Sequence, residues 1–383
     1  MALTGSEASA EAWRQINPDV APVYPITPTT EIVGKFSQYH ADGKVDTEMI
    51  LVECEHSAMS AAVGAAASGA RAVTATDSQG LAYMWEVIPI ASGLRLPIVM
   101  QIGNRALSSP GNIHCDHADS MACRDTSWIQ IYSETAQEVY ENTLLATRLA
   151  EHHDVHLPAM VMQDGFITSG NLEKVKVFDD TVVKNFIGPY NPLFSMTDMQ
   201  NPHSYGALNL HDSYFEAKRQ QEEAMQNAKK LYLEIGKELS QITGNKYEYF
   251  EKYRLEDAHY VIICMNATAG TTKEVIDRLR AKKKKVGLLK IKLFRPFPYE
   301  EVAAALKKAR GIAVLDRSES YGAFPPLFGE INSAISLLKK RPKIQSIIFG
   351  IGGRYIFETD IEEVYSQLMR NKFTTQPVYI GVR

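Results

Sequence analysis

The chain has 383 residues, of which 45% are hydrophobic and 22% are charged, so it can bury a sizeable core and is long enough for two domains. Its formal net charge of −4 at pH 7 argues against nucleic acid or an anionic membrane surface as the main partner. The most apolar run, 87–103, contains Arg95 and two prolines and is shorter than a bilayer span, and no signal-peptide pattern opens the sequence. The four cysteines form no CxxC pair and no ferredoxin-type run, which predicts reduced thiols in a cytoplasmic protein that holds no iron–sulfur cluster by itself.

Strand-forming runs alternate with helical patterns through the first 164 residues. The expected elements are a helix at 4–15, a strand at 21–26, a helix at 29–40, a strand at 48–53, a helix of small residues to 70, a strand at 71–77, a helix at 78–93, a strand at 96–104, a loop at 105–127, a strand at 128–134, a helix at 135–153 and a strand at 157–164. Strands rich in Val, Ile and Met, with helices between them, predict a doubly wound parallel sheet covered on both faces.

The alternation lapses between 170 and 212, where a segment rich in Pro, Asn and aromatic residues predicts an ordered surface arm. A charged amphipathic helix is expected at 213–240. The alternation then restarts, with strands at 259–265, 285–292, 311–317 and 344–353 and helices beginning near 271, 299 and 326. We therefore predict a first domain at 1–245, including the arm and helix, and a smaller α/β domain at 250–383.

Polar residues directly follow four of the predicted strands, at 24–27, 53–55, 77–79 and 104–105. Parallel α/β sheets bind ligands beyond the carboxyl ends of their strands. The sequence therefore predicts that these four stretches form one site.

Glu55 stands where a strand ends and a helix made almost entirely of Ala, Gly and Ser begins. The carboxylate could cap that helix by accepting amide hydrogen bonds. Alternatively, it could be a buried acid that binds a ring nitrogen of a heterocycle, because small residues allow a flat ligand or another backbone to approach closely. The small-residue helix favours the second interpretation. Glu53, on the other side of the pleat, is expected to be structural.

Arg105 directly follows the strand at 96–104 and opens a long polar loop. Its guanidinium could clamp a carboxylate or phosphate, or it could pair with a neighbouring acid.

The loop also carries an HxDHxD core, formed by His114, Asp116, His117 and Asp119. This spacing matches no strict metal motif, so we expect a hydrogen-bonded network there and no metal site. Thr27 lies between two prolines, in a stiff turn that presents its hydroxyl.

Several stretches together resemble a known family: YPITPTT, VECEHSAMSAAVGAAASGAR, TATDSQGLAYMWE, LPIVMQIGNRALSSPGNIHCDHADSM, RDTSWIQ and LFRPFP. They look very like the α subunit of pyruvate:ferredoxin oxidoreductase and its 2-oxoacid:ferredoxin relatives, essentially end to end. The resemblance implies a thiamine diphosphate-binding domain of the pyrimidine type, followed by a transketolase C-terminal-like domain. It also implies thiamine diphosphate shared with a β subunit that binds diphosphate and Mg²⁺, coenzyme A as co-substrate, and γ and ferredoxin-like δ subunits with [4Fe–4S] clusters. Ferredoxin or flavodoxin would accept the electrons.

The resemblance assigns roles to individual residues. It puts Glu55 at the glutamate that hydrogen-bonds the aminopyrimidine and favours formation of the thiazolium ylide, with Pro25 and Ile26 in the turn beside the cofactor. It puts Thr27 and Arg105 at the contacts to the 2-oxoacid carboxylate and carbonyl. The chain contains no GDG motif for diphosphate and Mg²⁺, as expected of an α subunit.

The expected reaction converts pyruvate, coenzyme A and oxidised ferredoxin into acetyl-CoA, CO₂ and reduced ferredoxin. A branched-chain or aryl 2-oxoacid is the alternative substrate. A non-catalytic scaffold is the alternative class of protein, against which the presence of both Glu55 and Arg105 argues.

Overall fold

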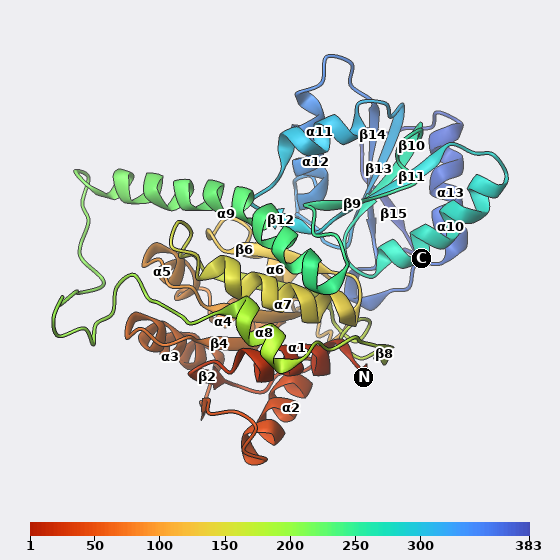
Figure 1. The fold of residues 1–383 in the computed structure, drawn as a ribbon. Coiled ribbons are helices and arrows are strands. Elements are labelled where there is room, and N and C mark those ends of the chain that lie inside the picture. Colours follow the sequence, from red (N-terminus) through yellow and green to blue (C-terminus); the bar gives the residue numbers. More distant parts are fainter.

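The computed structural model describes all 383 residues and consists of two α/β units, each built on its own sheet (Figure 1). The long helix α9 (Tyr214–Thr243) runs along the first unit and leads into the second. No helix combines the length and the apolar character needed to cross a membrane.

The first sheet has the strand order β3–β2–β4–β5–β7–β6–β12, in which β2 meets β4 through a single bridge between Val20 and Ala72. Its strands are β2 (Val20–Val23), β3 (Glu48–Leu51), β4 (Val73–Thr76), β5 (Val99–Asn104), β6 (Ile129–Ser133), β7 (Ala159–Asp164) and β12 (Leu293–Arg295). All neighbours pair in parallel except β12, which is antiparallel to β6. The prediction of a doubly wound, largely parallel sheet is therefore confirmed. A short antiparallel pair, β1 (Ala2–Leu3) with β8 (Glu173–Lys174), lies apart from it.

Helices cover both faces of this sheet, as right-handed crossovers require. One face carries α1 (Gly5–Ile16), α2 (Thr30–Ala41), α7 (Ala136–Ala150) and α8 (Asp180–Ile187), and the other carries α3 (Glu55–Ala67), α4 (Ser78–Tyr83), α5 (Ile88–Gly93) and α6 (Ala118–Ala122). The prediction of one helix at 78–93 is wrong, because two helices occupy this stretch. Pro89 falls in the first turn of α5, where a proline is tolerated, whereas inside a continuous helix it would break the hydrogen-bond ladder.

The second sheet has the order β15–β14–β13–β10–β11–β9, and only β9 is antiparallel. Its strands are β9 (Phe250–Tyr253), β10 (Tyr260–Cys264), β11 (Val286–Ile291), β13 (Gly311–Asp316), β14 (Lys343–Phe349) and β15 (Val378–Ile380). Helices α10 (Thr268–Ala281) and α13 (Glu358–Met369) pack together on one face, and α11 (Tyr299–Leu306) and α12 (Pro326–Ser336) pack together on the other.

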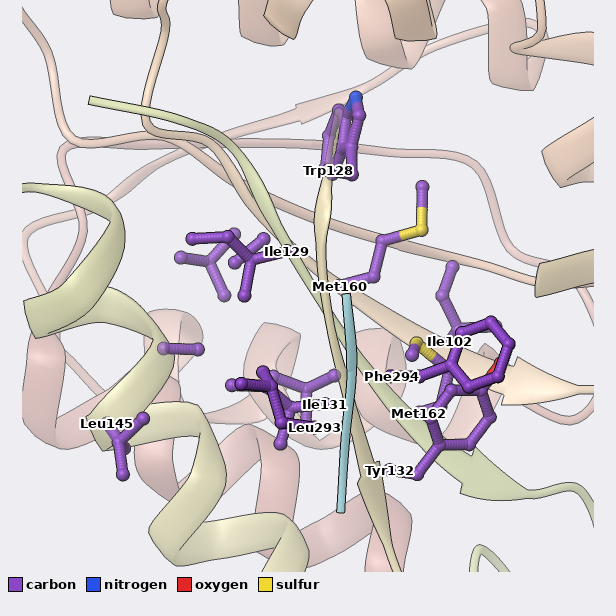
Figure 2. Close-up of a cluster of buried hydrophobic side chains, with 14 of the residues drawn as sticks. Ile102, Trp128, Ile129, Ile131, Tyr132, Leu145, Met160, Met162, Leu293 and Phe294 are labelled. Carbon is purple, nitrogen blue, oxygen red and sulfur yellow. The ribbon is translucent and has the colours of Figure 1, made fainter. Parts of the chain in front are cut away.

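Strand β12 belongs by sequence to the second half of the chain but completes the first sheet. Leu293 and Phe294 are fully buried among residues of β6 and β7, and the rings of Tyr132 and Phe294 lie 5.9 Å apart (Figure 2). The two units are thus interlocked through a shared core. The division into domains at 1–245 and 250–383 stays a prediction.

The stretch at 170–212, where the sequence predicts a surface arm, ends just before α9, and its part after α8 contacts the end of the small-residue helix. Ser195 donates to the carbonyl oxygen of Ser68 over 2.7 Å, and the amide of Met196 donates to Ala67 over 2.9 Å. Helix α8, which the sequence did not predict, lies within this stretch.

The carboxyl ends of the two sheets face each other. Asp164 at the end of β7 accepts a hydrogen bond of 2.9 Å from Asn266, which follows β10. Arg317, directly after β13, lies 3.6 Å from the same carboxylate. The carboxyl end of β7 is therefore close to the second unit.

Candidate active site

Glu55 is the first residue of α3, and the residue is only 8% exposed. Neither a backbone amide nor a side chain of the protein donates a hydrogen bond to its carboxylate, so the structure does not show the capping role that the sequence left open. Glu53 differs, because it is exposed and accepts a hydrogen bond of 2.5 Å from Ser57. A buried carboxylate with free acceptor positions is suited to bind a donor on a ligand.

Gly80 in α4 makes room for the Glu55 carboxylate. A Cβ atom at this position would lie 2.8 Å from Glu55 Oε1 and 2.4 Å from Thr76 Oγ1, closer than real contacts allow. The Thr76 hydroxyl is itself buried without a partner. The free acceptor positions of the Glu55 carboxylate fit a ligand that donates a hydrogen bond, such as an aminopyrimidine. The sequence analysis missed Gly80, although it lies just beyond the β4 strand end that was placed in the site.

Arg105 and Thr27, predicted to share a site, are in direct contact. Arg105 Nη1 donates to the carbonyl oxygen of Thr27 over 2.7 Å, and the arginine side chain is 15% exposed. The Thr27 side chain is exposed, as is Pro25, while Ile26 is half-buried in the same turn. The Nε atom of Arg105 is buried without a hydrogen-bond partner.

Asp77, which directly follows β4, is the acid that pairs with Arg105. Its Oδ1 lies 3.2 Å from Arg105 Nη1, and its Oδ2 accepts a hydrogen bond of 3.0 Å from Thr29. Burial, reinforced by the charge of Asp119 and opposed by Arg105, raises the pKa of Asp77 to about 7. The sequence placed Asp77 at a strand end but assigned it no role. Asp77 is thus the neighbouring acid that the sequence offered as an alternative partner for Arg105.

Asp119 ties the loop after Arg105 back to the strand ends. Its Oδ2 accepts hydrogen bonds of 3.0 Å from the amides of Ser78 and of Arg105, and Asn104 donates to Oδ1 over 2.7 Å. Burial is the largest influence on this carboxyl and raises its pKa to about 6 although the surrounding donors oppose the shift. Sequence reasoning grouped Asp119 with the HxDHxD core but did not see that it holds the backbone of Arg105.

The other three polar side chains of that core have separate partners. His114 packs 5.4 Å from the ring of Phe166, and Asp116 accepts from the amide of Gly352 over 3.3 Å. His117 contacts Asp164 over 2.8 Å. Asp116 and His117 are thus held by hydrogen bonds, whereas the His114 ring makes a packing contact.

Cys115 lies close to His117 and Asp164, with ligand atoms within 4.8 Å of one another, and the three side chains are buried. The Arg317 guanidinium already balances the Asp164 charge, at 3.6 Å. Burial raises the pKa of the Cys115 thiol, so this group adds no negative charge to the cluster.

Two family descriptions match the chain. "Pyruvate flavodoxin/ferredoxin oxidoreductase, thiamine diP-bdg" matches residues 11–237, and "Pyruvate:ferredoxin oxidoreductase core domain II" matches residues 258–361. Together they cover most of both α/β units.

Among curated proteins, the chain is 50% identical to pyruvate synthase subunit PorA of Thermotoga maritima, over 100% of this chain and 98% of that protein. It is 40% identical to ketoisovalerate oxidoreductase subunit VorA of Pyrococcus abyssi, over 96% and 93% of the two chains. Among solved structures it resembles a 2-oxoglutarate:ferredoxin oxidoreductase from Magnetococcus marinus, with a TM-score of 0.72 and 19% identity. That match covers 96% of this chain and 65% of the other and shows a shared fold.

Proposed function

The chain belongs to the pyruvate:ferredoxin oxidoreductase family, and we propose that it is the α subunit of a multi-subunit enzyme that oxidatively decarboxylates pyruvate. The reaction consumes pyruvate, coenzyme A and oxidised ferredoxin and releases acetyl-CoA, CO₂ and reduced ferredoxin. Pyruvate is the proposed substrate because identity to the pyruvate synthase subunit of Thermotoga maritima is 50% over the whole chain. The two subunits of Pyrococcus abyssi, 41% identical for pyruvate synthase and 40% for ketoisovalerate oxidoreductase, do not separate the two substrates.

The observation that carries this proposal is the Glu55 carboxylate, buried at the start of α3 with no hydrogen-bond donor from the protein. The free acceptor positions of this carboxylate, which Gly80 leaves room for, support a ligand that donates to it. A heterocyclic ring nitrogen that carries a proton is such a donor.

Thiamine diphosphate, when bound, supplies the nucleophilic carbon that attacks the 2-oxo group and the electron sink for decarboxylation. Glu55 accepts the proton of the pyrimidine nitrogen in a hydrogen bond and so favours the ring form that can take up a proton elsewhere. Positioned proton transfer of this kind contributes roughly 10²–10⁴ in rate. Pro25 and Ile26 line the turn beside the cofactor ring.

Arg105 binds the substrate carboxylate, and Thr27, in the turn that Arg105 contacts, orients the 2-oxo group. The partly exposed guanidinium can bind the substrate carboxylate while it also contacts Asp77.

The remaining parts of the reaction belong to partner subunits. A β subunit holds the diphosphate and Mg²⁺, because this chain contains no GDG motif. The γ and ferredoxin-like δ subunits carry [4Fe–4S] clusters that pass electrons to ferredoxin or flavodoxin, since the four cysteines of this chain are dispersed, free and mostly buried. The assembly is cytoplasmic, where such thiols stay reduced.

Purification of the tagged chain from its native host tests the proposal. We expect a brown complex of several subunits that reduces ferredoxin or a viologen dye only when both pyruvate and coenzyme A are added. A colourless, single-chain preparation, or reduction that is independent of the 2-oxoacid, would refute it. Replacing pyruvate by 2-oxoisovalerate in the same assay decides the substrate.

A further inference from the structure

The loop at 105–119, which we call the substrate loop, closes back on the residue proposed to bind the substrate carboxylate. The amide of Ala106 donates to the carbonyl oxygen of His114 over 2.9 Å, and Asp119 accepts from the amide of Arg105 over 3.0 Å. Asp119 is only 2% exposed. Any displacement of residues 114–119 therefore moves the backbone of Arg105.

The second unit forms backbone hydrogen bonds with this same part of the loop. The amide of His117 donates to the carbonyl oxygen of Arg317 over 2.8 Å, and the amide of Gly353 donates to that of Cys115 over 2.7 Å. Gly353 has a φ of +81°, and a Cβ there would lie 2.3 Å from the Cβ of His114. The close approach of the two backbones is thus possible only with glycine at this position.

Buried charges hold the contact in place. Arg317, Asp164 and His117 are 5%, 0% and 3% exposed, and Asp164 lies 3.6 Å from Arg317 Nη1 and 2.8 Å from His117 Nε2. Burial opposes ionisation of Asp164, but the positive charge of Arg317 and the hydrogen bond from His117 outweigh it and hold the pKa of Asp164 well below its usual range. Removing the Arg317 charge would leave a buried carboxylate between the two sheets without its counter-ion.

We propose that Arg317 is a positioning residue for Arg105: from the second sheet it holds the substrate loop in place and so sets the orientation of the guanidinium that binds the substrate carboxylate. This inference rests on the proposed function. It gives the second unit a part in substrate binding, although none of its side chains needs to touch the substrate.

The alternative is that Arg317 only stabilises the contact between the two units and does not position Arg105. The chain offers a matched control for this alternative. Lys290 on β11 is 2% exposed and also links the two units, since it lies 2.5 Å from Glu134 and 2.8 Å from Glu138. Its ion-pair partners lie outside the substrate loop. Lys290→Met therefore removes a buried inter-unit cation without touching the loop.

The experiment compares Arg317→Met, Arg317→Lys and Lys290→Met in the assembled complex. We expect Arg317→Met to raise the KM for pyruvate about tenfold with a smaller change in kcat, and to speed amide hydrogen exchange in peptides covering 105–119. Lys290→Met should lower the thermal midpoint but leave the KM for pyruvate and the hydrogen exchange of residues 105–119 at their wild-type values. Arg317→Lys, which keeps the charge, should have a KM for pyruvate between those of Arg317→Met and the wild type.

A double-mutant cycle with Arg105→Ala then tests whether Arg317 acts through Arg105. If it does, adding Arg317→Met to Arg105→Ala changes kcat/KM for pyruvate by less than twofold. Independent, multiplying effects would overturn the inference, as would an unchanged KM or unchanged loop exchange in Arg317→Met. A wild-type complex without pyruvate-dependent reduction would instead refute the proposed function, and the exchange measurement would still decide whether Arg317 holds the loop.

Discussion

Arg105 Nη1 lies 2.7 Å from the carbonyl oxygen of Thr27 and 3.2 Å from Asp77 Oδ1, so the proposed carboxylate clamp already has an anionic neighbour. Asp77 is fully buried and Arg105 partly exposed, so the pair lies at the inner end of the site. A substrate carboxylate must therefore share the guanidinium with Asp77. How strongly the two compete depends on whether Asp77 is ionised.

This relationship predicts a pH dependence. With a pKa of about 7, Asp77 is largely neutral at pH 6 and largely ionised at pH 8, where its charge competes with the substrate for Arg105. We expect kcat/KM for pyruvate to fall by up to roughly tenfold as the pH rises through this range. Asp77→Asn should remove that fall, while the exposed control Asp42→Asn should keep it. The same decline in both variants would exclude Asp77 as its source.

Glu55→Gln should lower turnover of the assembled complex by roughly 10²–10⁴, because the amide keeps the shape but not the charge that binds the protonated ring nitrogen. Since no protein donor depends on the carboxylate, the thermal midpoint should change little. Glu53→Gln, two residues away and exposed, should retain full turnover. A lowered thermal midpoint with normal turnover in Glu55→Gln would instead support a structural role for this residue.

Gly80→Ala should misplace Glu55, because the added methyl would lie 2.8 Å from Oε1 and 2.4 Å from Thr76 Oγ1. We expect turnover to fall at least tenfold in steady-state assays of the complex. Gly64→Ala in α3 is the control, since nothing lies within 4 Å of the new Cβ. It should stabilise the isolated chain by about 0.5–1 kcal/mol, as Ala does relative to Gly in a helix. Equal turnover in both variants would show that the space at Gly80 is not needed.

The sequence predicted those parts of the fold that local patterns encode. Alternating strand and helix patterns indicated both sheets, and the polar residues after the strands indicated the edge where Thr27 and Arg105 meet. Strand β12 is three residues long, too short to show a period, and pairs with β6 about 160 positions earlier in the sequence. Its place is fixed by burial of Leu293 and Phe294 in a distant core, which no local pattern reveals.

In the candidate site, too, local patterns indicated some residues, whereas contacts between distant segments could not be predicted. Glu55 was recognisable because an acid before a small-residue helix is unusual in itself. The pairing of Asp77 with Arg105 and the hold of Arg317 on the substrate loop join segments that are far apart in the sequence. Such contacts depend on how the two sheets meet, which periodicity does not specify.

The isolated chain should bind thiamine diphosphate weakly, with a Kd no tighter than about the millimolar range. The reason is that the chain supplies the pyrimidine contact at Glu55 but has no GDG motif for the diphosphate and Mg²⁺. Titration calorimetry with and without Mg²⁺ measures this, with the assembled complex as the positive control. Micromolar, Mg²⁺-dependent binding by the chain alone would contradict the division of the cofactor between two subunits.

Substitutions at Arg105 and Thr27 should separate general substrate binding from choice of substrate. Every 2-oxoacid carries the carboxylate, so Arg105→Ala should lower kcat/KM similarly for pyruvate and 2-oxoisovalerate. A charge-assisted contact is worth about 1.5–3 kcal/mol, or roughly ten- to a hundredfold. Thr27→Ala changes an exposed side chain in the turn that Arg105 contacts, so it should alter the ratio of the two activities instead. A changed ratio with Arg105→Ala and an unchanged one with Thr27→Ala would reverse this assignment and place substrate choice at the guanidinium.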